Sequence, residues 1–285
     1  MITEDTMHTF QTPSPVQLRA QVWEGSLSVV AEDTDTTTVE LVPERGSDGA
    51  QHLIDQATVE QRGDDIVVLM PKAKSGLFRR GHGVSVTVHM PTDSSARLES
   101  GSADIETRGP LGDLSVHAGS GDVGIELAAD VEARLGSGDL RLETARGSVD
   151  IKGGSSDIVI GTIAEAANVL TGSGDLQISR ISGLLKVKTG SGGVVVKQAG
   201  EAVDAMAGSG DLLLERVDFG RVKAKTGSGD VAIGVAQGTA AHLDIMTISG
   251  DVRSELDGTT GPDDGDQTVE ISVTSGSGDV LLKRS

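Results

Sequence analysis

Aspartates recur at a nearly constant spacing through the last two thirds of the chain. Each follows a glycine-rich word, GSGD or a close copy of it, and the positions are Asp104, Asp122, Asp139, Asp157, Asp175, Asp211, Asp230, Asp251 and Asp279. Gly193 interrupts the series. If neighbouring strands stack in register, these carboxylates stand about 5 Å apart, where repulsion is ~1 kcal/mol per pair in water and ~3 at an intermediate dielectric. The column therefore needs water, hydrogen bonds or cations.

Two roles fit such a column. In the first, each aspartate caps its turn by accepting backbone N–H bonds, while the flanking glycines take positive φ. In the second, the column binds calcium, as in glycine-rich nonapeptide rolls, and the ligands are Asp122, Asp139, Asp157, Asp175, Asp211 and Asp230. Those rolls need a Gly-x-Asp turn on both edges, but nine residues after the first glycine of four words stand Ala145, Ile181, Val217 and Ala236. We therefore expect the capping role and no cofactor, with calcium as the alternative.

A basic stretch stands out in an acidic protein. The chain has 24 Lys and Arg against 43 Asp and Glu, a net charge of −19, and the candidate partner-binding residues of the stretch are Lys72, Lys74, Phe78, Arg79 and Arg80. We expect it either to be a solvated loop or to attract an acidic partner, including the acidic edge of another copy. The overall negative charge argues against nucleic acid as a partner.

The C-terminal strand is a second candidate surface. After the final GSGD the sequence runs Val280-Leu281-Leu282-Lys283-Arg284-Ser285. If this strand forms the last layer of a sheet, its outer edge is open and can pair with another chain. We therefore expect Leu281 and Leu282 to take part in an edge-to-edge homodimer, which Lys283 and Arg284 keep finite.

Signatures of catalysis are weak, and we expect the protein not to be an enzyme. Gly119–Gly124 spells GxGxxG, but Ile125-Glu126-Leu127 continues as a strand where a dinucleotide site needs a helix. The 6 histidines are scattered, and the sequence holds no HExxH or GxSxG motif. The absence of cysteine excludes disulfides, a thiol nucleophile and cysteine-ligated zinc.

The repeat that carries the aspartates predicts the fold. Its words begin at Gly101, Gly119, Gly136, Gly154, Gly172, Gly190, Gly208 and Gly227, so the period is 17 to 19 residues. Apolar residues alternate on both sides of each word, for example at Val123 and Ile125 and at Leu185 and Val187. Alternation is typical of strands, and a unit of two strands buries its apolar face only by stacking on others. We predict an all-β fold, a single-stranded parallel β-solenoid with two strands per 18-residue turn and a right-handed coil.

The first third of the chain lacks the repeated word but keeps the alternation. Strands are predicted at Val16–Val22, Asp65–Met70 and Val84–Met90, and Pro43, Pro71 and Pro91 end strand-like runs. We predict two regions, an N-terminal cap with irregular first turns over residues 1–95 and the GSGD-repeat solenoid over residues 96–285. A separate small β-domain over the first region is the alternative.

The repeat resembles a known family. GSGD-Val-x-Ile, preceded by a V-x-V-x-T strand at a period of 18 residues, resembles the bacterial adhesin-like family of β-strand-repeat proteins, a domain of unknown function. The stretch Val84–Pro91, which ends in Met-Pro before the first repeat, is similar to members of that family. The resemblance covers most of the chain and implies roles in adhesion or at the cell envelope. It carries over no catalytic residue.

The expected function follows from fold and composition together. We expect a rigid, acidic scaffold that binds a protein partner or another copy of itself. No run approaches ~20 consecutive apolar residues, so no transmembrane segment is expected. The first residues, MITEDTMHTFQTPSPV, lack the basic start and apolar run of a signal peptide. A cytoplasmic location is the expectation.

Overall fold

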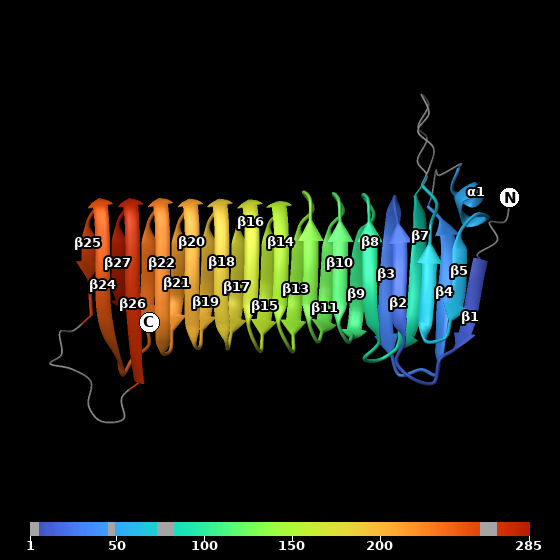
Figure 1. Cartoon of the computed structure of the whole chain (residues 1–285), viewed down its shortest axis with the longest axis horizontal. Coiled ribbons are helices and arrows are strands. Elements are labelled where there is room, and N and C mark those ends of the chain that lie inside the picture. Colours follow the sequence, from blue (N-terminus) through green and yellow to red (C-terminus); the bar gives the residue numbers. More distant parts are fainter. Residues whose placement is uncertain (1–5, 45–48, 73–82, 257–266) are drawn as a thin grey trace. The chain divides into compact units, whose positions relative to one another are not determined.

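The protein is built almost entirely of β-strands (Figure 1). The computed structural model describes residues 6–44, 49–72, 83–256 and 267–285. By its internal contacts the chain divides into two compact units, Met1–Thr144 (unit 1) and Ala145–Ser285 (unit 2). The predicted all-β fold with parallel strands in long sheets is confirmed.

Unit 1 contains two sheets and a short helix. Its elements are β1 (Thr6–Gln11), β2 (Gln17–Val22), β3 (Gly25–Glu32), β4 (Thr36–Pro43), α1 (Ala50–Ile54), β5 (Thr58–Arg62), β6 (Asp65–Leu69), β7 (Val84–Pro91), β8 (Ser95–Ser100), β9 (Asp104–Pro110), β10 (Leu114–Ala118), β11 (Val123–Ala128), β12 (Val131–Leu135) and β13 (Leu140–Ala145), in which the division between the units falls. One sheet has the order β1-β4-β7-β3-β9-β11-β13 and the other β5-β6-β2-β8-β10-β12. Among the helices of the described residues, none has the length and hydropathy needed to cross a membrane.

The described part of unit 2 consists of strands and contains no helix. Its strands are β14 (Val149–Ser155), β15 (Ile158–Ile163), β16 (Ala167–Ser173), β17 (Leu176–Ile181), β18 (Leu184–Ser191), β19 (Val194–Ala199), β20 (Ala202–Ser209), β21 (Leu212–Val217), β22 (Gly220–Ser228), β23 (Val231–Val235), β24 (Thr239–Ser249), β25 (Val252–Ser254), β26 (Gln267–Ser277) and β27 (Val280–Arg284). One sheet has the order β15-β17-β19-β21-β23-β27-β25 and the other β14-β16-β18-β20-β22-β26-β24. Successive strands of the chain thus alternate between two sheets.

The register of the paired strands places similar side chains next to one another in successive layers. In unit 2 the partners across successive strands form a column of buried aliphatic residues, Ile158, Leu176, Val194, Leu212, Val231 and Val280. Partners in a parallel ladder share a face of the sheet, so the alternation seen in the sequence becomes a continuous core. Full burial of one such side chain contributes about 1.5–3 kcal/mol, which is how a chain with few aromatic residues builds its core.

The N-terminal strands extend the sheets of unit 1. The predicted strands are present as β2, β6 and β7, while α1, β3 and β4 were not predicted. β2 pairs in parallel with both β6 and β8, and β3 pairs with both β7 and β9. Antiparallel pairs join β1 to β4, β4 to β7 and β5 to β6. The cap interpretation and the boundary between residues 95 and 96 both stay predictions.

The expectation that the last strand of the chain forms the open edge is wrong. β27 lies between β23 and β25, and β26 lies between β22 and β24. Leu282 pairs with Ile233 on one side and Ser254 on the other and is fully buried. Val280 and Leu282 continue two aliphatic columns, whereas β25 offers Ser254 at the second position. The better-matched strand therefore occupies the inner place, and β24 and β25 form the edge.

Candidate functional site

The aspartates form a hydrogen-bonded series that we call the aspartate ladder. In unit 1 the N–H of Asp122 donates to Oδ1 of Asp104 at 3.0 Å, and the N–H of Asp139 donates to Oδ1 of Asp122 at 2.9 Å. In unit 2 the corresponding donor–acceptor pairs are Asp175–Asp157, Gly193–Asp175, Asp230–Asp211 and Asp279–Asp230 at 2.8 Å, and Asp251–Asp279 at 2.9 Å. These aspartates thus accept backbone N–H bonds, as expected, but each donor belongs to the adjacent strand layer and not to the turn of the aspartate itself.

Glycines beside the ladder allow the turns to stack closely. Gly210 has φ +146°, and a Cβ built there would stand 2.2 Å from the carbonyl oxygen of Gly192. Gly192, with φ +139°, meets the oxygen of Gly174 in the same way at 2.1 Å. Both the positive φ and the close approach exclude a side chain. The word GSGD therefore combines a close-packed turn with a carboxylate that caps its neighbour.

Metal binding by the ladder finds no support in its geometry. Among the residues that the structure describes, no group of three or more His, Asp or Glu could hold a metal ion. One carboxylate oxygen of each acceptor named above is already engaged by a backbone N–H. The ladder thus meets its need for hydrogen bonds within the protein.

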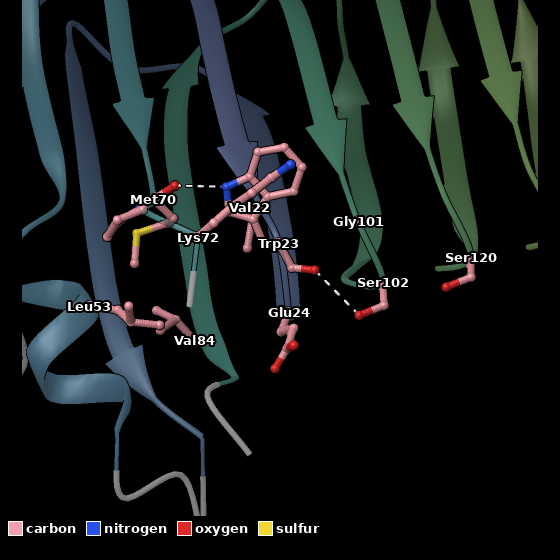
Figure 2. Close-up of a pocket in the computed structure, with 11 residues that line it drawn as sticks. Val22, Trp23, Glu24, Leu53, Met70, Lys72, Val84, Gly101, Ser102 and Ser120 are labelled. Atoms are coloured by element: carbon pink, nitrogen blue, oxygen red, sulfur yellow. Dashed lines mark hydrogen bonds between the residues drawn. The ribbon is translucent and has the colours of Figure 1, made fainter. Parts of the chain in front are cut away.

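Of the basic stretch, Lys72 lies inside the described residues. Its amine stands 3.7 Å from the ring centroid of Trp23, a cation–π contact (Figure 2). Lys74, Phe78, Arg79 and Arg80 lie outside the described residues. The structure therefore links one member of the predicted set to the single tryptophan of the chain.

Trp23 lies in a pocket of about 330 Å³ in unit 1. Its indole N–H donates to the carbonyl oxygen of Met70 at 3.0 Å, and the Ser102 hydroxyl donates to the Trp23 carbonyl at 3.3 Å (Figure 2). The lining combines apolar and polar groups, namely Val22, Trp23, Glu24, Leu53, Met70, Pro71, Lys72, Val84, Gly101, Ser102 and Ser120. The volume falls within the range of small-ligand pockets, about 300–1,000 Å³. An apolar wall with an amine, a carboxylate and hydroxyls suits a small amphipathic molecule.

The sequence did not reveal this pocket. Its lining comes from segments far apart in the chain, which meet because β2 lies between β6 and β8. The one signal was the lone tryptophan, since a single large aromatic ring in an aliphatic protein marks a local exception. No spacing rule connects Trp23 with Leu53 or Met70.

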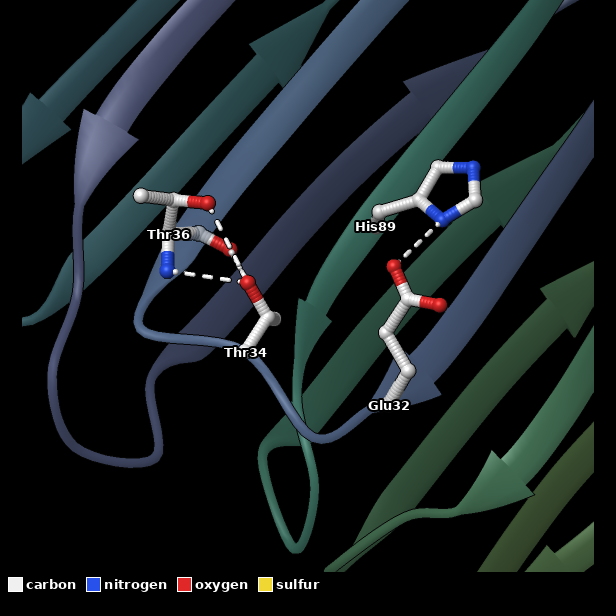
Figure 3. A network of polar contacts seen from close by, with 4 residues as sticks. All are labelled: Glu32, Thr34, Thr36 and His89. Atoms are coloured by element: carbon white, nitrogen blue, oxygen red, sulfur yellow. Dashed lines mark hydrogen bonds and ion pairs between the residues drawn. The ribbon is translucent and has the colours of Figure 1, made fainter.

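Other sequence features have structural roles. Residues of the GxGxxG match lead into β11, so the strand interpretation of that stretch is confirmed. His89 pairs with Glu32 at 2.9 Å between Nδ1 and Oε1, close to the turn in which Thr34 and Thr36 bond to each other (Figure 3). This pair joins β7 to β3.

The carboxyl group of Asp218 has a pKa below its usual value. Burial alone would raise the pKa of its carboxyl group. Hydrogen bonds from Gln198 and Arg216, both at 2.7 Å, and the charges of Arg216 and Arg180 outweigh burial and hold the pKa below its usual value. The group follows β21 and ties neighbouring strand layers together.

The outermost strands of unit 2 are exposed and apolar. β24 pairs with β26, and β25 pairs with β27, each on one side (Figure 1). Large hydrophobic side chains are exposed on both strands, namely Leu243, Met246, Ile248 and Val252. We call the surface formed by β24 and β25 the open end of unit 2. It replaces the predicted surface at Leu281 and Leu282.

Comparisons with known proteins found one family model that matches the chain and several solved structures that are similar to it. The family model described as Toastrack DUF4097 matches residues 25–283. Among solved structures, the chain is similar to a candidate adhesin from Bacteroides fragilis, with 10% identity, 98% and 97% of the two chains covered and a TM-score of 0.45. A candidate lipid-binding protein from Parabacteroides distasonis matches at 13% identity, with 99% and 97% covered and a TM-score of 0.43. A candidate adhesin from the same species matches at 13% identity, with 98% and 97% covered and a TM-score of 0.42. A search of curated proteins found no match.

Proposed function

The chain belongs to the Toastrack DUF4097 family, and we propose that it is a non-enzymatic, adhesin-like binding module. In this proposal the stacked strands are a stiff scaffold that presents a sheet edge to a protein partner or to another copy. The observation that carries the proposal is the open end of unit 2. The successive alternation of strands between two sheets supports a solenoid with two strands per turn as the scaffold, and we propose a right-handed coil because parallel crossover connections are almost always right-handed.

β24 has the properties of a strand that accepts another strand. It is 11 residues long and lies at the edge of its sheet, so one row of its backbone N–H and C=O groups faces away from β26. Met246 and Ile248 add apolar contacts on its outer face. A long apolar edge is a template for pairing with an extended segment.

The contrast with an edge of unit 1 supports the proposal. β5, at the edge of its sheet, has 5 residues and carries the ion pair between Arg62 and Glu60. Short length and exposed charge are the usual protection of a sheet edge against unwanted pairing. β24 is more than twice as long and carries neither lysine nor arginine, although Asp244 and His242 are exposed on it. Its edge therefore has less protection against pairing than that of β5.

The aspartate ladder has a structural role in this proposal. The alternative is a calcium-binding roll with Asp122, Asp139, Asp157, Asp175, Asp211 and Asp230 as ligands. The hydrogen bonds along the ladder favour the structural role, because they supply the stabilisation that repelling carboxylates need.

A strand-binding assay tests the proposal. The probe is a fluorescein-labelled peptide with the sequence of β24, and its anisotropy is followed as protein is added. Met246→Lys combined with Ile248→Lys is expected to weaken binding at least about tenfold, because two apolar side chains worth about 1.5–3 kcal/mol each lose their burial. The matched control, Leu170→Lys with Leu184→Lys, changes exposed residues of β16 and β18 and is expected to bind as the unchanged protein does. Absence of binding, or equal binding by both variants, would overturn the proposal.

A further inference from the structure

Among the described residues, the aliphatic columns of unit 2 end in partly exposed side chains. One column runs through Val149, Ala167, Leu185, Val203, Val222 and Ile271 to Leu243. All members before Leu243 are buried, whereas Leu243 is 36% exposed. In the other sheet the column that includes Val231 and Val280 ends at Val252, which is 48% exposed. The last described layer therefore has core-facing side chains that a further layer can bury.

The outer face of β24 is apolar as well. Met246 is 64% exposed and Ile248 is 86% exposed. These residues alternate with Leu243 and Ile245, whose partners Ile271 and Val273 are buried in the core. Both faces of one edge strand thus expose hydrophobic side chains, which marks an interaction surface.

The strand pattern restricts how a second β24 can pair with the first. In an antiparallel pair, directly opposite residues lie on the same face of the sheet. Odd-numbered residues of β24 face the core, so an odd residue must oppose an odd residue. A two-fold axis then passes through a residue of β24 and not between two residues.

Charge selects among these registers. With the axis at Asp244, the two Asp244 carboxylates oppose each other and repel. With the axis at Leu243, His242 opposes Asp244 of the second copy, and the pair occurs twice. Leu243 then faces its own counterpart, and Ala241 faces Ile245 of the second copy, so the core side stays apolar. With the axis at Ile245, Asp244 opposes Met246 and gains no charged partner.

We propose that the partner at the open end of unit 2 is a second copy of the chain, paired antiparallel through β24 about a two-fold axis at Leu243. This inference rests on the proposed function and names the partner. An isologous contact of this kind closes on itself, so the product is a dimer and not a fibre. The contact extends the sheet and covers Leu243 at the end of its column.

Cysteine cross-linking tests the register directly. The chain has no cysteine, so Leu243→Cys can form a disulfide only with the same residue of another copy. Opposite Cα atoms of an antiparallel pair are about 4.5–5.5 Å apart, within the disulfide range of about 4.4–6.8 Å. We expect Leu243→Cys to give a covalent dimer on mild oxidation, faster than Asp244→Cys or Ile245→Cys. Leu184→Cys, an exposed leucine of β18 within the sheet, is the matched control and is expected to remain monomeric.

Charge-swap variants test the same register without altering the core side. His242→Asp places like charges opposite each other twice, so the dimer measured by sedimentation velocity should weaken about tenfold. Adding Asp244→His restores two histidine–aspartate pairs, in which an imidazole N–H can donate to the carboxylate, and should restore the dimer. Both residues are exposed, so folding is not at risk.

Two results would overturn the inference. One is a monomer throughout the micromolar range with no cross-linking of Leu243→Cys. The other is a dimer that cross-links faster through Asp244→Cys or Ile245→Cys. If the protein is monomeric but still binds the β24 peptide, the inference fails while the proposed function stands. If peptide binding is lost as well, both fail.

Discussion

At the scale of single residues, the repeats are held together by short carboxylate-to-backbone hydrogen bonds. Each acceptor aspartate of the ladder receives an N–H from the next layer at 2.8 to 3.0 Å. A hydrogen bond to a charged group contributes about 1.5–3 kcal/mol, which exceeds the ~1 kcal/mol of repulsion between solvated neighbours. The ladder is therefore net stabilising although every member carries the same charge.

Gly193 interrupts the ladder and offers a direct test. A Cβ at Gly193 would have no heavy-atom neighbour nearer than 3.6 Å, so a side chain fits. We expect Gly193→Asp to raise the free energy of unfolding by about 1 kcal/mol, because the new carboxylate can accept the N–H of Asp211. Gly193→Ala is the control for backbone entropy, worth about 0.4–1 kcal/mol by itself. Equal stability of the two variants in urea titrations would contradict the ladder.

Calcium provides a second test of the ladder. We expect the same thermal midpoint in EDTA and in millimolar calcium, since backbone N–H groups already engage the carboxylates. A site filled at 100 times its Kd would add about 2.7 kcal/mol. Magnesium at the same concentration controls for general screening of the negative charge. A midpoint that rises with calcium alone would support the calcium roll.

The lowered pKa of Asp218 predicts that its contribution to folding stability depends on pH. Because its folded pKa is lowered, the group adds stability above the unfolded pKa of about 3.9, and this stability is lost as pH falls through the folded pKa. We expect Asp218→Asn to lower the midpoint at neutral pH and to approach the unchanged protein in strong acid. A difference that stays constant from neutral to acidic pH would show that the charge has no part in it.

The residue-scale features differ in how far sequence could predict them. The aspartate positions and their need for hydrogen bonds follow from a regular period and from Coulomb repulsion. The donor could not be predicted, because it lies one layer away and depends on the stacking. The pocket at Trp23 was missed because Leu53 and Met70 reach it through strand order, which local pattern does not encode.

At the scale of elements, the turns between strands limit what the repeats tolerate. The positive-φ glycines of the repeated word, such as Gly192, Gly210 and Gly229, stand where the turn of one layer contacts the backbone of the next. The positive φ is a conformational requirement for glycine, and the close approach of the neighbouring backbone is a steric one. Together they explain why this turn is nearly constant in sequence, while the other turn varies.

A Gly210→Ala variant tests whether close stacking makes a side chain in these turns more costly than in an open turn. We expect it to lower the free energy of unfolding by about 2–5 kcal/mol, since left-handed backbone costs about 1–2 kcal/mol and overpacking about 1–3. Gly63→Ala is the matched control, because Gly63 has φ +63° but a Cβ built there would have no heavy atom within 4 Å. Equal losses in the two variants would argue against close stacking of the turns.

Strand identity was predictable, whereas strand order at the ends was not. Alternation predicted β2, β6 and β7, because period two is a local property of the sequence. The insertion of β26 and β27 between earlier strands was not predictable, because β24 and β26 both have the strand pattern. In the structure Ile271 and Val273 are buried in the columns, and Leu243, which is exposed, and Ile245, which is half-buried, form the layer beyond them.

At the scale of the whole molecule, the proposed binding role depends on whether β24 meets a partner. Hydrogen–deuterium exchange of β24 at low and high micromolar protein concentration measures this most directly, because pairing protects its outward N–H groups. We predict slower exchange in β24 at the higher concentration, with no change in β20, which is already paired on both sides. Exchange in β24 that is unaffected by concentration and by added β24 peptide would contradict the account.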